Sequence, residues 1–174
     1  PQKCNDLIRR GGMENNALDV WRTKKKRQTL GVIEGGRESL YALASWNRKL
    51  SGNGPDQTVL RKKYDGCLVP GALYDFSAWV QLVNQKSGEG VNCTATGSLE
   101  AIDRKMGNGL CPTLFVKAWD LEGRTREWRA RRYLDAWRLN DWNNLHARFT
   151  MWPQTDDWSG DVDRLRIRIS EMNR

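Results

Sequence analysis

The chain contains a single histidine, and this scarcity removes many of the familiar catalytic and metal-binding chemistries. Zinc in proteins is held mainly by His and Cys, and no Cys-x-x-Cys pair is present, so a zinc site is not expected. The sequence also lacks the Gly-x-Ser-x-Gly, Gly-x-Gly-x-x-Gly and phosphate-loop motifs. No motif pairs two carboxylates as a glycosidase requires. We therefore expect a protein that is not an enzyme.

Long apolar stretches are absent as well. No segment approaches the roughly 18 consecutive apolar residues of a membrane-spanning helix, so no membrane partner is expected. No signal peptide is visible, and we interpret Pro1 as the start of a processed or excised piece. The 174 residues suit one domain, 1–174, that is long enough to bury a core. With 9 Trp and a hydrophobic fraction of 39%, the composition is not that of a disordered chain.

Acidic residues are too few to balance the basic ones. The chain has 29 Lys and Arg against 21 Asp and Glu, which gives a net charge of +8. Such a surface favours anionic partners, namely nucleic acid, acidic or sulfated polysaccharide, or anionic lipid. The plainer alternative is that the charge serves solubility alone.

Four widely spaced cysteines and a glycosylation sequon at Asn92 favour a secreted protein with two disulfides, although a reduced cytosolic chain is the alternative. Of the three possible pairings we predict Cys93–Cys111 and Cys4–Cys67. Cys93 and Cys111 bracket a Gly-rich insertion with few apolar residues to hold it, so a local disulfide is expected there.

Short alternating segments separated by Gly-rich turns dominate the chain and predict an all-β sandwich of two antiparallel sheets. The expected strands are Asp6 to Arg9, Trp21 to Thr23, Thr29 to Ile33, Leu40 to Trp46, Gln57 to Arg61, Leu73 to Val83, Leu114 to Leu121, Arg126 to Tyr133, His146 to Met151 and Arg164 to Ile169. Helical spacing occurs only in Gly97 to Met106, which predicts one short helical insertion.

The segment that begins at Pro70-Gly71 is the clearest of these strands. After the turn, Tyr74 and Phe76 fall on one face of a strict alternation, and the polar residues fall on the other. Trp79 lies on the polar face. A solvent-side indole on a sheet is a candidate stacking surface for a flat ligand.

Five segments in a fixed order carry a resemblance to a known group of proteins. They are a short strand with Gly-x-Glu and a later Trp (Leu7 to Glu14 and Leu18 to Trp21), a strand with a Gly pair (Val32 to Gly36), a strand that ends in Asn-Arg (Leu40 to Arg48), the run Gly54 to Gln57, and the strand Leu73 to Val80. In these segments, from about Leu7 to Val83, the chain resembles the carbohydrate-binding modules of families four, nine and twenty-two.

The resemblance implies a jelly-roll β-sandwich without catalytic machinery, which binds sugar chains in a groove over one sheet with aromatic rings under the sugars. It also implies a structural calcium ion, held by Glu14 and by Asp163, with Asp161 as the alternative second carboxylate. Calcium takes six or more oxygen ligands, so backbone carbonyls would supply the rest.

Outward-facing arginines and indoles on the later strands predict the binding surface. We expect Trp79 and Trp119 to stack on sugar rings, and Arg148, Arg166 and Arg168 to grip carboxylate or sulfate groups in a two-pronged geometry. This hypothesis assumes that their strands share one outward face. The plain alternative is that the arginines form the ordinary solvated face of a sandwich.

Six of the remaining seven tryptophans divide by their neighbours. Trp21, Trp128 and Trp142 are expected to pack in the core. Polar or loop neighbours keep three others as candidates for a ligand: Trp46, Trp152 and Trp158.

The leading interpretation is a secreted module that binds polysaccharide, with a preference for acidic or sulfated glycans. A nucleic-acid or general polyanion binder is the second hypothesis, supported by charge and aromatic residues but without a recognition motif. A structural or adhesion domain is the third. Binding to a phosphate backbone should weaken steeply with salt, and sugar stacking should weaken far less.

Overall fold

A computed structural model describes residues 18, 20–22, 29–37, 40–46, 55–60, 66–94, 109–130, 133 and 135–170. This part of the chain contains ten β-strands and no α-helix. The strands are β1 (Thr29–Glu34), β2 (Tyr41–Trp46), β3 (Asp56–Leu60), β4 (Leu73–Val80), β5 (Cys93–Thr94), β6 (Gly109–Leu110), β7 (Thr113–Asp120), β8 (Thr125–Ala130), β9 (Asn143–Thr150) and β10 (Val162–Ser170).

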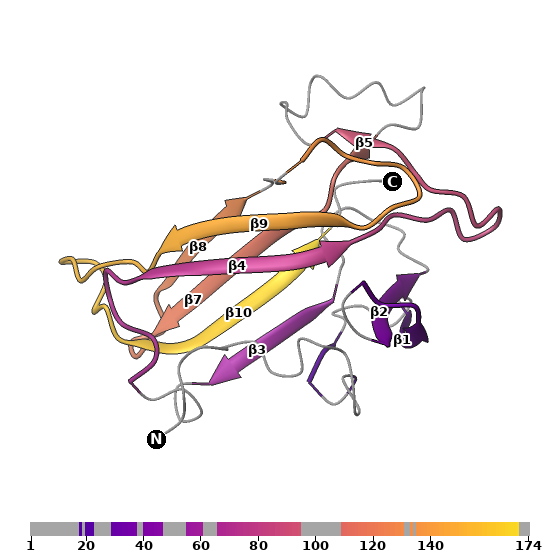
Figure 1. Ribbon diagram of the computed structural model, residues 1–174. Helices are drawn as coiled ribbons and strands as arrows, with labels where there is room; N and C mark the ends of the chain where they lie inside the picture. The colour runs from indigo at the N-terminus through magenta and orange to yellow at the C-terminus, as the bar shows by residue number, and fades with distance from the viewer. Residues whose placement is uncertain are drawn as a thin grey trace.

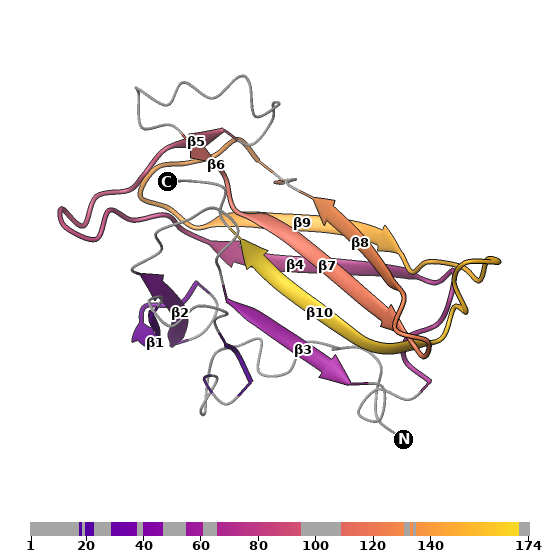
Figure 2. The same cartoon turned by 180° about the vertical axis from the view of Figure 1, so that it is seen from behind.

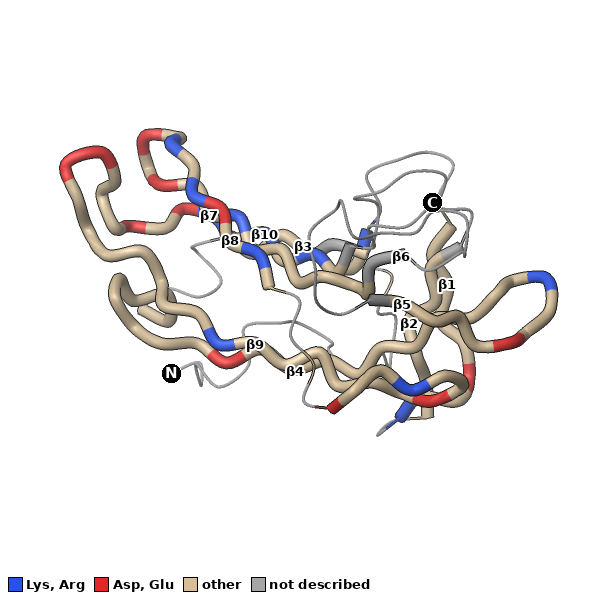
Figure 3. Tube along the Cα trace, turned by 90° about the horizontal axis from the view of Figure 1, so that it is seen from above, with Lys and Arg blue, Asp and Glu red and all other residues tan. Residues whose placement is uncertain are grey.

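Two antiparallel layers form the body of the molecule. One is a four-stranded sheet in the order β3–β10–β7–β8, and the other is the β4–β9 pair (Figure 1, Figure 2). Seen from above, the two layers lie one over the other, with the β1–β2 hairpin at one end (Figure 3). The predicted all-β sandwich of two antiparallel sheets is therefore confirmed. The two-residue β5–β6 pair is parallel and stands apart from both layers.

The core lies between the layers because each strand alternates apolar and polar residues. Leu114, Val116 and Ala118 of β7 point inward beside Leu165 and Ile167 of β10, and all five are buried. From the opposite layer they meet the buried side chains Phe76, Leu145, Ala147 and Phe149.

Eight of the ten expected strands are present, with ends that differ by a few residues. For example, β9 begins at Asn143 and not at His146, because Asn143 occupies an inward, buried position that its polarity concealed. Trp21 is buried, but Trp21 and Arg22 belong to none of the ten strands; Thr23, the last residue of the strand expected there, lies outside the described residues. The strand expected at Asp6 to Arg9 and the helical insertion expected at Gly97 to Met106 lie outside the described residues.

The predicted Cys93–Cys111 disulfide is present, with Cα atoms 4.9 Å apart, and it lies in a second small core with Leu82. Cys67 is buried and disulfide-bonded; Cys4 lies outside the described residues, so that pairing stays a prediction. Asn92 is exposed and accepts a hydrogen bond from the backbone N–H of Cys93 at 2.9 Å. Glycosylation there also stays a prediction.

Within the described residues, no helix has the length and apolar character needed to cross a membrane.

Removing the Cys93–Cys111 crosslink should destabilise the fold. The bridged residues are 18 positions apart, and closing a loop of this size is worth about 3 kcal/mol in the chain-entropy account. We expect Cys93→Ser/Cys111→Ser to lose about that free energy of unfolding in a denaturant titration. Each single variant should show one titratable thiol after unfolding and the parent none; a parent with two free thiols would contradict one of the two predicted disulfides, and a parent with four would contradict both.

Candidate functional site

The structure divides the five predicted ligand-contacting side chains between two sheets. Trp119 lies on β7, and Arg166 and Arg168 lie on β10 of the four-stranded sheet. Trp79 lies on β4 and Arg148 on β9 of the other layer. Because the two layers pack through their inner faces, their outer faces point away from each other. The assumption of one shared outward face is therefore wrong, and two surfaces have to be considered separately.

The first surface, which we call the basic face, is the outer side of β7, β8 and β10. Residues directly opposite in an antiparallel pair project to the same side of the sheet. The register places Arg164 opposite Trp119, Arg166 opposite Lys117 and Arg168 opposite Phe115. From the other side, Glu127 lies opposite Lys117 and Arg129 lies opposite Phe115. Cations and aromatic rings thus occur side by side across three strands.

Trp119 lies close to two cations, Arg164 on the neighbouring strand β10 and Lys117 on its own strand. The guanidinium carbon of Arg164 lies 4.7 Å from the ring centroid, and the Nζ of Lys117 lies 5.2 Å from it. Both distances are within the range of cation–π attraction. The indole is half-buried, so it orients the two charges while part of it remains in contact with solvent.

Phe115 repeats the arrangement two rows along the sheet, beyond the row of Lys117. Arg168 and Arg129 place their guanidinium carbons 4.6 Å and 5.0 Å from its ring centroid. Although it faces outward, only 6% of Phe115 is exposed. Arginine side chains can cover apolar surface in this way while they keep their charged ends in water.

Charge on the basic face is strongly positive. Among the side chains that the structure describes there, five are basic and one, Glu127, is acidic, and Figure 3 shows this concentration of Lys and Arg along the sheet. Lys117 binds Glu127 at 2.8 Å, and Arg129 lies 3.8 Å from it. The hydrogen bond from Lys117, together with the charges of Lys117, Arg129 and Arg168, holds the pKa of Glu127 below its ordinary value despite its partial burial.

The second surface, the outer side of β4 and β9, is more nearly balanced in charge. Arg148 donates to both carboxylate oxygens of Asp75, at 2.7 Å and 3.3 Å, and His146 lies 3.9 Å from the same carboxylate. The hydrogen bond from Arg148 is the main cause of the lowered pKa of Asp75. Because Asp75 occupies the two-pronged side of Arg148, that guanidinium has less to offer an external anion than the sequence suggested.

A pocket lies at the C-terminal end of β4 and the start of β9, and we call it the end pocket. Its volume is about 70 Å³. Arg37, in the turn between β1 and β2, stacks on the Trp79 ring at 4.9 Å from the centroid. The residues that matter most in its lining are Arg37, Trp79, Arg138, Asp141, Trp142 and Asn144.

The loop that forms one wall of the end pocket is fixed by backbone contacts. The buried amide of Asn143 accepts from the Arg138 N–H at 2.7 Å and donates to the carbonyls of Arg138 and Asp141, both at 3.0 Å. Asn140 has a positive φ of 57° and accepts the backbone N–H of Gly90. A Cβ at position 90 would collide with the Asn140 backbone, so only glycine allows this approach.

Sequence reasoning missed most of the end pocket. Trp142 was expected in the core, but it is half-buried and lines the pocket. The run Asp141 to Asn144 could have indicated the pocket, because an indole between hydrogen-bonding side chains is a common setting for polar ligands. In contrast, Trp158 was expected to remain available to a ligand, and it is completely buried. Its ring packs edge-on against Trp152 at 6.1 Å between centroids.

No family model matches the chain, and no curated protein sequence matches it. Solved structures do match. The CBM22-1–GH10 modules of Clostridium thermocellum endo-1,4-beta-D-xylanase 10B, complexed with xylohexaose, give a TM-score of 0.56 at 15% identity over 89% of this chain. The CBM22-1–CBM22-2 tandem domain of Paenibacillus barcinonensis Xyn10C gives 0.56 at 14% identity over 95% of it. The fold is that of the family 22 carbohydrate-binding modules.

The likeness to family 22 concerns the fold, since the identities are low. The chain spans 24% and 40% of the length of those two structures. The same fold is also matched in the enzymatically active domain of bacteriophage CBA120 tailspike protein 4, with a TM-score of 0.51 at 12% identity, over 98% of this chain and 20% of that one. The expected jelly-roll architecture is thus supported by proteins of more than one kind.

The calcium site implied by the resemblance to families four, nine and twenty-two lies only partly within the described residues. Asp163 is half-buried on β10, at a break in the register between β10 and β7. Glu14 lies outside the described residues. Among the residues that are described, no three His, Cys, Asp or Glu side chains lie close enough to hold a metal ion. Asp163 would therefore need Glu14 and backbone oxygens as partners, and calcium stays a prediction.

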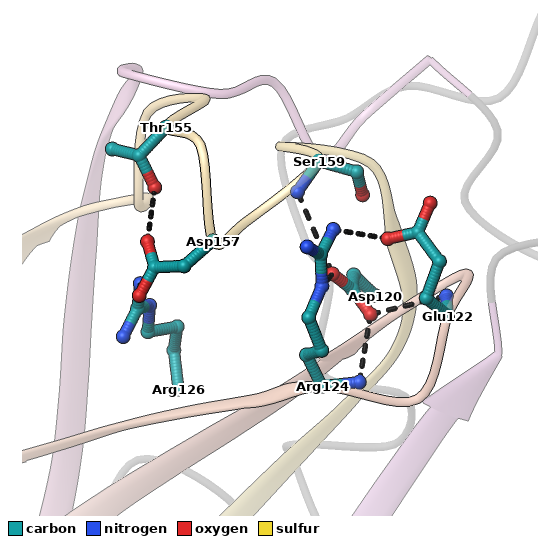
Figure 4. Close-up of polar contacts among 7 residues, drawn as sticks. All are labelled: Asp120, Glu122, Arg124, Arg126, Thr155, Asp157 and Ser159. Atoms are coloured by element: carbon teal, nitrogen blue, oxygen red, sulfur yellow. Dashed lines mark hydrogen bonds and ion pairs between the residues drawn. The ribbon is translucent and has the colours of Figure 1, made fainter.

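A cluster of carboxylates at and near the β7–β8 turn serves the fold of the chain. The buried Asp120 accepts the backbone N–H groups of Glu122 and Arg124, at 3.1 Å and 2.8 Å, and the Nε of Arg124 at 2.7 Å (Figure 4). Arg124 also pairs with Glu122. Nearby, Asp157 pairs with Arg126 at 2.6 Å and accepts from Thr155 (Figure 4). Each carboxylate in this cluster is engaged with a neighbouring arginine, which is an arrangement that stabilises a turn.

Replacing Asp120 with Asn should lower the melting temperature by several degrees at neutral pH. Burial raises the pKa of Asp120, but hydrogen bonds from Arg124 and Ser159 and the charge of Arg124 outweigh it, so the pKa lies below its ordinary value. The carboxylate therefore stabilises the fold above about pH 4, and this contribution is lost as pH falls through the folded-state pKa. The difference between parent and variant, measured by thermal melts across pH, should shrink in acid. Glu122→Gln, an exposed change in the same turn, is the control; an equal effect there would contradict the role of Asp120.

Proposed function

We propose that the protein is a non-catalytic carbohydrate-binding module whose basic face binds an acidic polysaccharide. The observation that carries the proposal is the cross-strand array in which Arg164 and Lys117 lie over the Trp119 ring. The likeness to family 22 xylanase modules, one of them complexed with xylohexaose, supports a polysaccharide as the ligand class. The disulfides support a secreted protein, since such bonds persist in oxidising compartments.

The extent of the basic face suits a polymer. Arg164, Arg166 and Arg168 alternate along β10, so the first and last are about 13 Å apart along the strand. The three strands β10, β7 and β8 add a width of about 10 Å. An array of this size can contact several charged groups of one chain at once, whereas a single small anion would use only part of it.

The arginines on this face favour carboxylate or sulfate groups. A guanidinium binds such groups with two parallel hydrogen bonds, and a lysine ammonium cannot reproduce that geometry. Arg166 lies at the centre of the array, between Lys117 on one neighbouring strand and Thr58 on the other. An anionic group bound at Arg166 would therefore lie beside Arg164, Arg168 and Lys117.

The aromatic residues give the face a second kind of contact. A sugar ring has an apolar face that can stack on an indole, and Trp119 is the half-exposed indole in the array. A polymer that carries both rings and acidic groups would use Trp119 and the arginines together. Duplex nucleic acid, in which the base faces are already stacked, would use mainly the cations, and this second candidate is favoured by the same concentration of charge.

Replacing Arg166 with Gln should weaken binding to polygalacturonate or heparin about tenfold, the effect of losing one charge-assisted contact. Binding to neutral xylan should change much less, and Arg166→Lys should fall between parent and Gln variant on the acidic polymers. Affinity electrophoresis at physiological salt measures these differences. Lys86→Gln removes one positive charge from an exposed turn away from the face and is the matched control.

Trp119→Ala separates the two candidate functions. For a polysaccharide ligand, loss of the indole should reduce binding even at high salt, because stacking does not depend on counterion release. If the parent binds duplex DNA with a steep salt dependence and is not retarded by any glycan, the basic face is a general polyanion surface. If Arg166→Gln and Trp119→Ala both migrate like the parent on every retarding glycan, the proposed surface is the wrong one.

A further inference from the structure

Strand β8 forms one edge of the four-stranded sheet. The order β3–β10–β7–β8 places it at the end of the sheet, and among the described strands it pairs with β7 alone (Figure 2). Beyond Ala130, Tyr133 forms a bridge with Leu145 of β9, which belongs to the other layer. The six residues Thr125–Ala130 therefore present an edge to which another strand can pair.

The backbone groups on this edge can be assigned from the alternation of the ladder. The Asp120 N–H donates to the Arg124 carbonyl at 3.1 Å, so these two residues form a hydrogen-bonded pair. Hydrogen-bonded and non-hydrogen-bonded pairs alternate along an antiparallel ladder. The register then places Glu127 and Arg129 at non-hydrogen-bonded positions. Their N–H and C=O groups therefore point away from β7, toward the open edge.

The side chains at these two positions make the edge self-complementary. Glu127 and Arg129 both lie on the outer face of β8, with 41% and 61% of their side chains exposed. Two copies of β8 can pair antiparallel about a two-fold axis at Trp128, and Glu127 of each copy then lies opposite Arg129 of the other. Each such pair exchanges two backbone hydrogen bonds. Opposite charges directly across a ladder stabilise the pairing further.

The same charges disfavour the neighbouring registers. An axis at Glu127 would bring two carboxylates face to face, and an axis at Arg129 would bring two guanidinium groups face to face. Like charges directly opposite destabilise a pair of strands. The register centred on Trp128 is therefore the one that this edge selects.

Trp128 adds an aromatic contact at the axis. Its ring packs against Phe149 at 5.2 Å between centroids, and the residue is half-buried. In the register centred on Trp128, this residue faces its own copy at a non-hydrogen-bonded position, where opposing side chains come closest. Aromatic cross-strand pairs stabilise a sheet. Backbone groups, charges and the indole thus all fit one partner, a second copy of this chain.

We propose that the protein forms a two-fold dimer through β8, in which two four-stranded sheets join into one sheet of eight strands. The basic faces of both copies then lie on the same side, with their β10 strands about 24 Å apart at the usual strand spacing. The dimer needs no glycan. Its consequence rests on the proposed function: a polymer that reaches both arrays is held at two points and gains avidity.

The interface is small, so the dimer should be weak. Contacts that bury less than about 1,200 Å² in total are mostly transient, and an edge of six residues belongs to this class. Sedimentation equilibrium of the full chain without glycan should show the mass rising from monomer toward dimer between about 10 μM and 1 mM.

Hydrogen exchange measured by NMR identifies the edge. The Glu127 and Arg129 amides should exchange about fivefold more slowly at 1 mM than in dilute solution, the factor for a dissociation constant of about 0.1 mM. The amides of Arg126 and Trp128 face β7 and should not change. A constant mass, or a rising mass without added protection at Glu127 and Arg129, would overturn the inference.

Two charge variants provide the matched control. Glu127→Arg and Arg129→Glu each bring like charges together in the register centred on Trp128, so each variant alone should stay monomeric. An equimolar mixture restores opposite charges in both pairs and should dimerise as the parent does, which two folding defects would not do. If both variants melt like the parent and their mixture stays monomeric, the proposed pairing is wrong.

Polysaccharide binding is measured separately. The mixture should bind long polygalacturonate more tightly than either variant alone, whereas a short oligogalacturonate should show no such gain. A dimer that binds no glycan would support the interface and contradict only the proposed function. A parent that binds polygalacturonate and stays monomeric at 1 mM would contradict the dimer and leave the proposed function in place.

Discussion

Burial of the first half of β7 on both of its faces is the constraint on which the rest of the structure depends. Its inner residues Leu114, Val116 and Ala118 pack in the sandwich core, and its outer residues Thr113 and Phe115 are also buried. Antiparallel sheets commonly leave one face in water. A segment that is buried on both sides is therefore packed more completely than its neighbours, and its position in the sheet is well determined. The neighbouring strands β10 and β8 take their register from β7, and with it the positions of the arginines that surround its aromatic rings.

Strand identity could be predicted from the sequence because alternation is a local property. The strand after Pro70-Gly71 and the Arg164 to Ile169 strand were both found, and Phe76 of the first and Leu165 and Ile167 of the second are buried. Strand order could not be predicted in the same way, since nothing in the spacing of Trp79 or Trp119 indicates which strands they pair with. For that reason the predicted binding surface combined residues of two different sheets. Trp119 and Arg166 lie on the four-stranded sheet, whereas Trp79 lies on the β4–β9 pair.

Burial in the loops was harder still to predict. Trp158 has polar neighbours in the sequence, yet a bridge between Thr155 and Trp158 folds that loop back on itself and directs the indole into the core. Trp142 looked like a packing residue, but the fixed loop before β9 leaves it half-buried beside the end pocket. In both cases the folded path of the loop determines exposure, and the polarity of the residue's neighbours in sequence does not indicate it.

The arginines of the basic face have a consequence for how the ligand could be identified. A guanidinium keeps its charge across the whole pH range in which proteins remain folded. The charge of this face is therefore almost constant, and any change of binding with acidity reports on the ligand and not on the arginines. Carboxyl groups ordinarily titrate near pH 4, whereas a sulfate ester stays ionised well below that. The pH dependence of binding thus distinguishes the two kinds of acidic glycan. A chain of uronic acids would detach from the arginines below about pH 4, and a sulfated chain would stay attached.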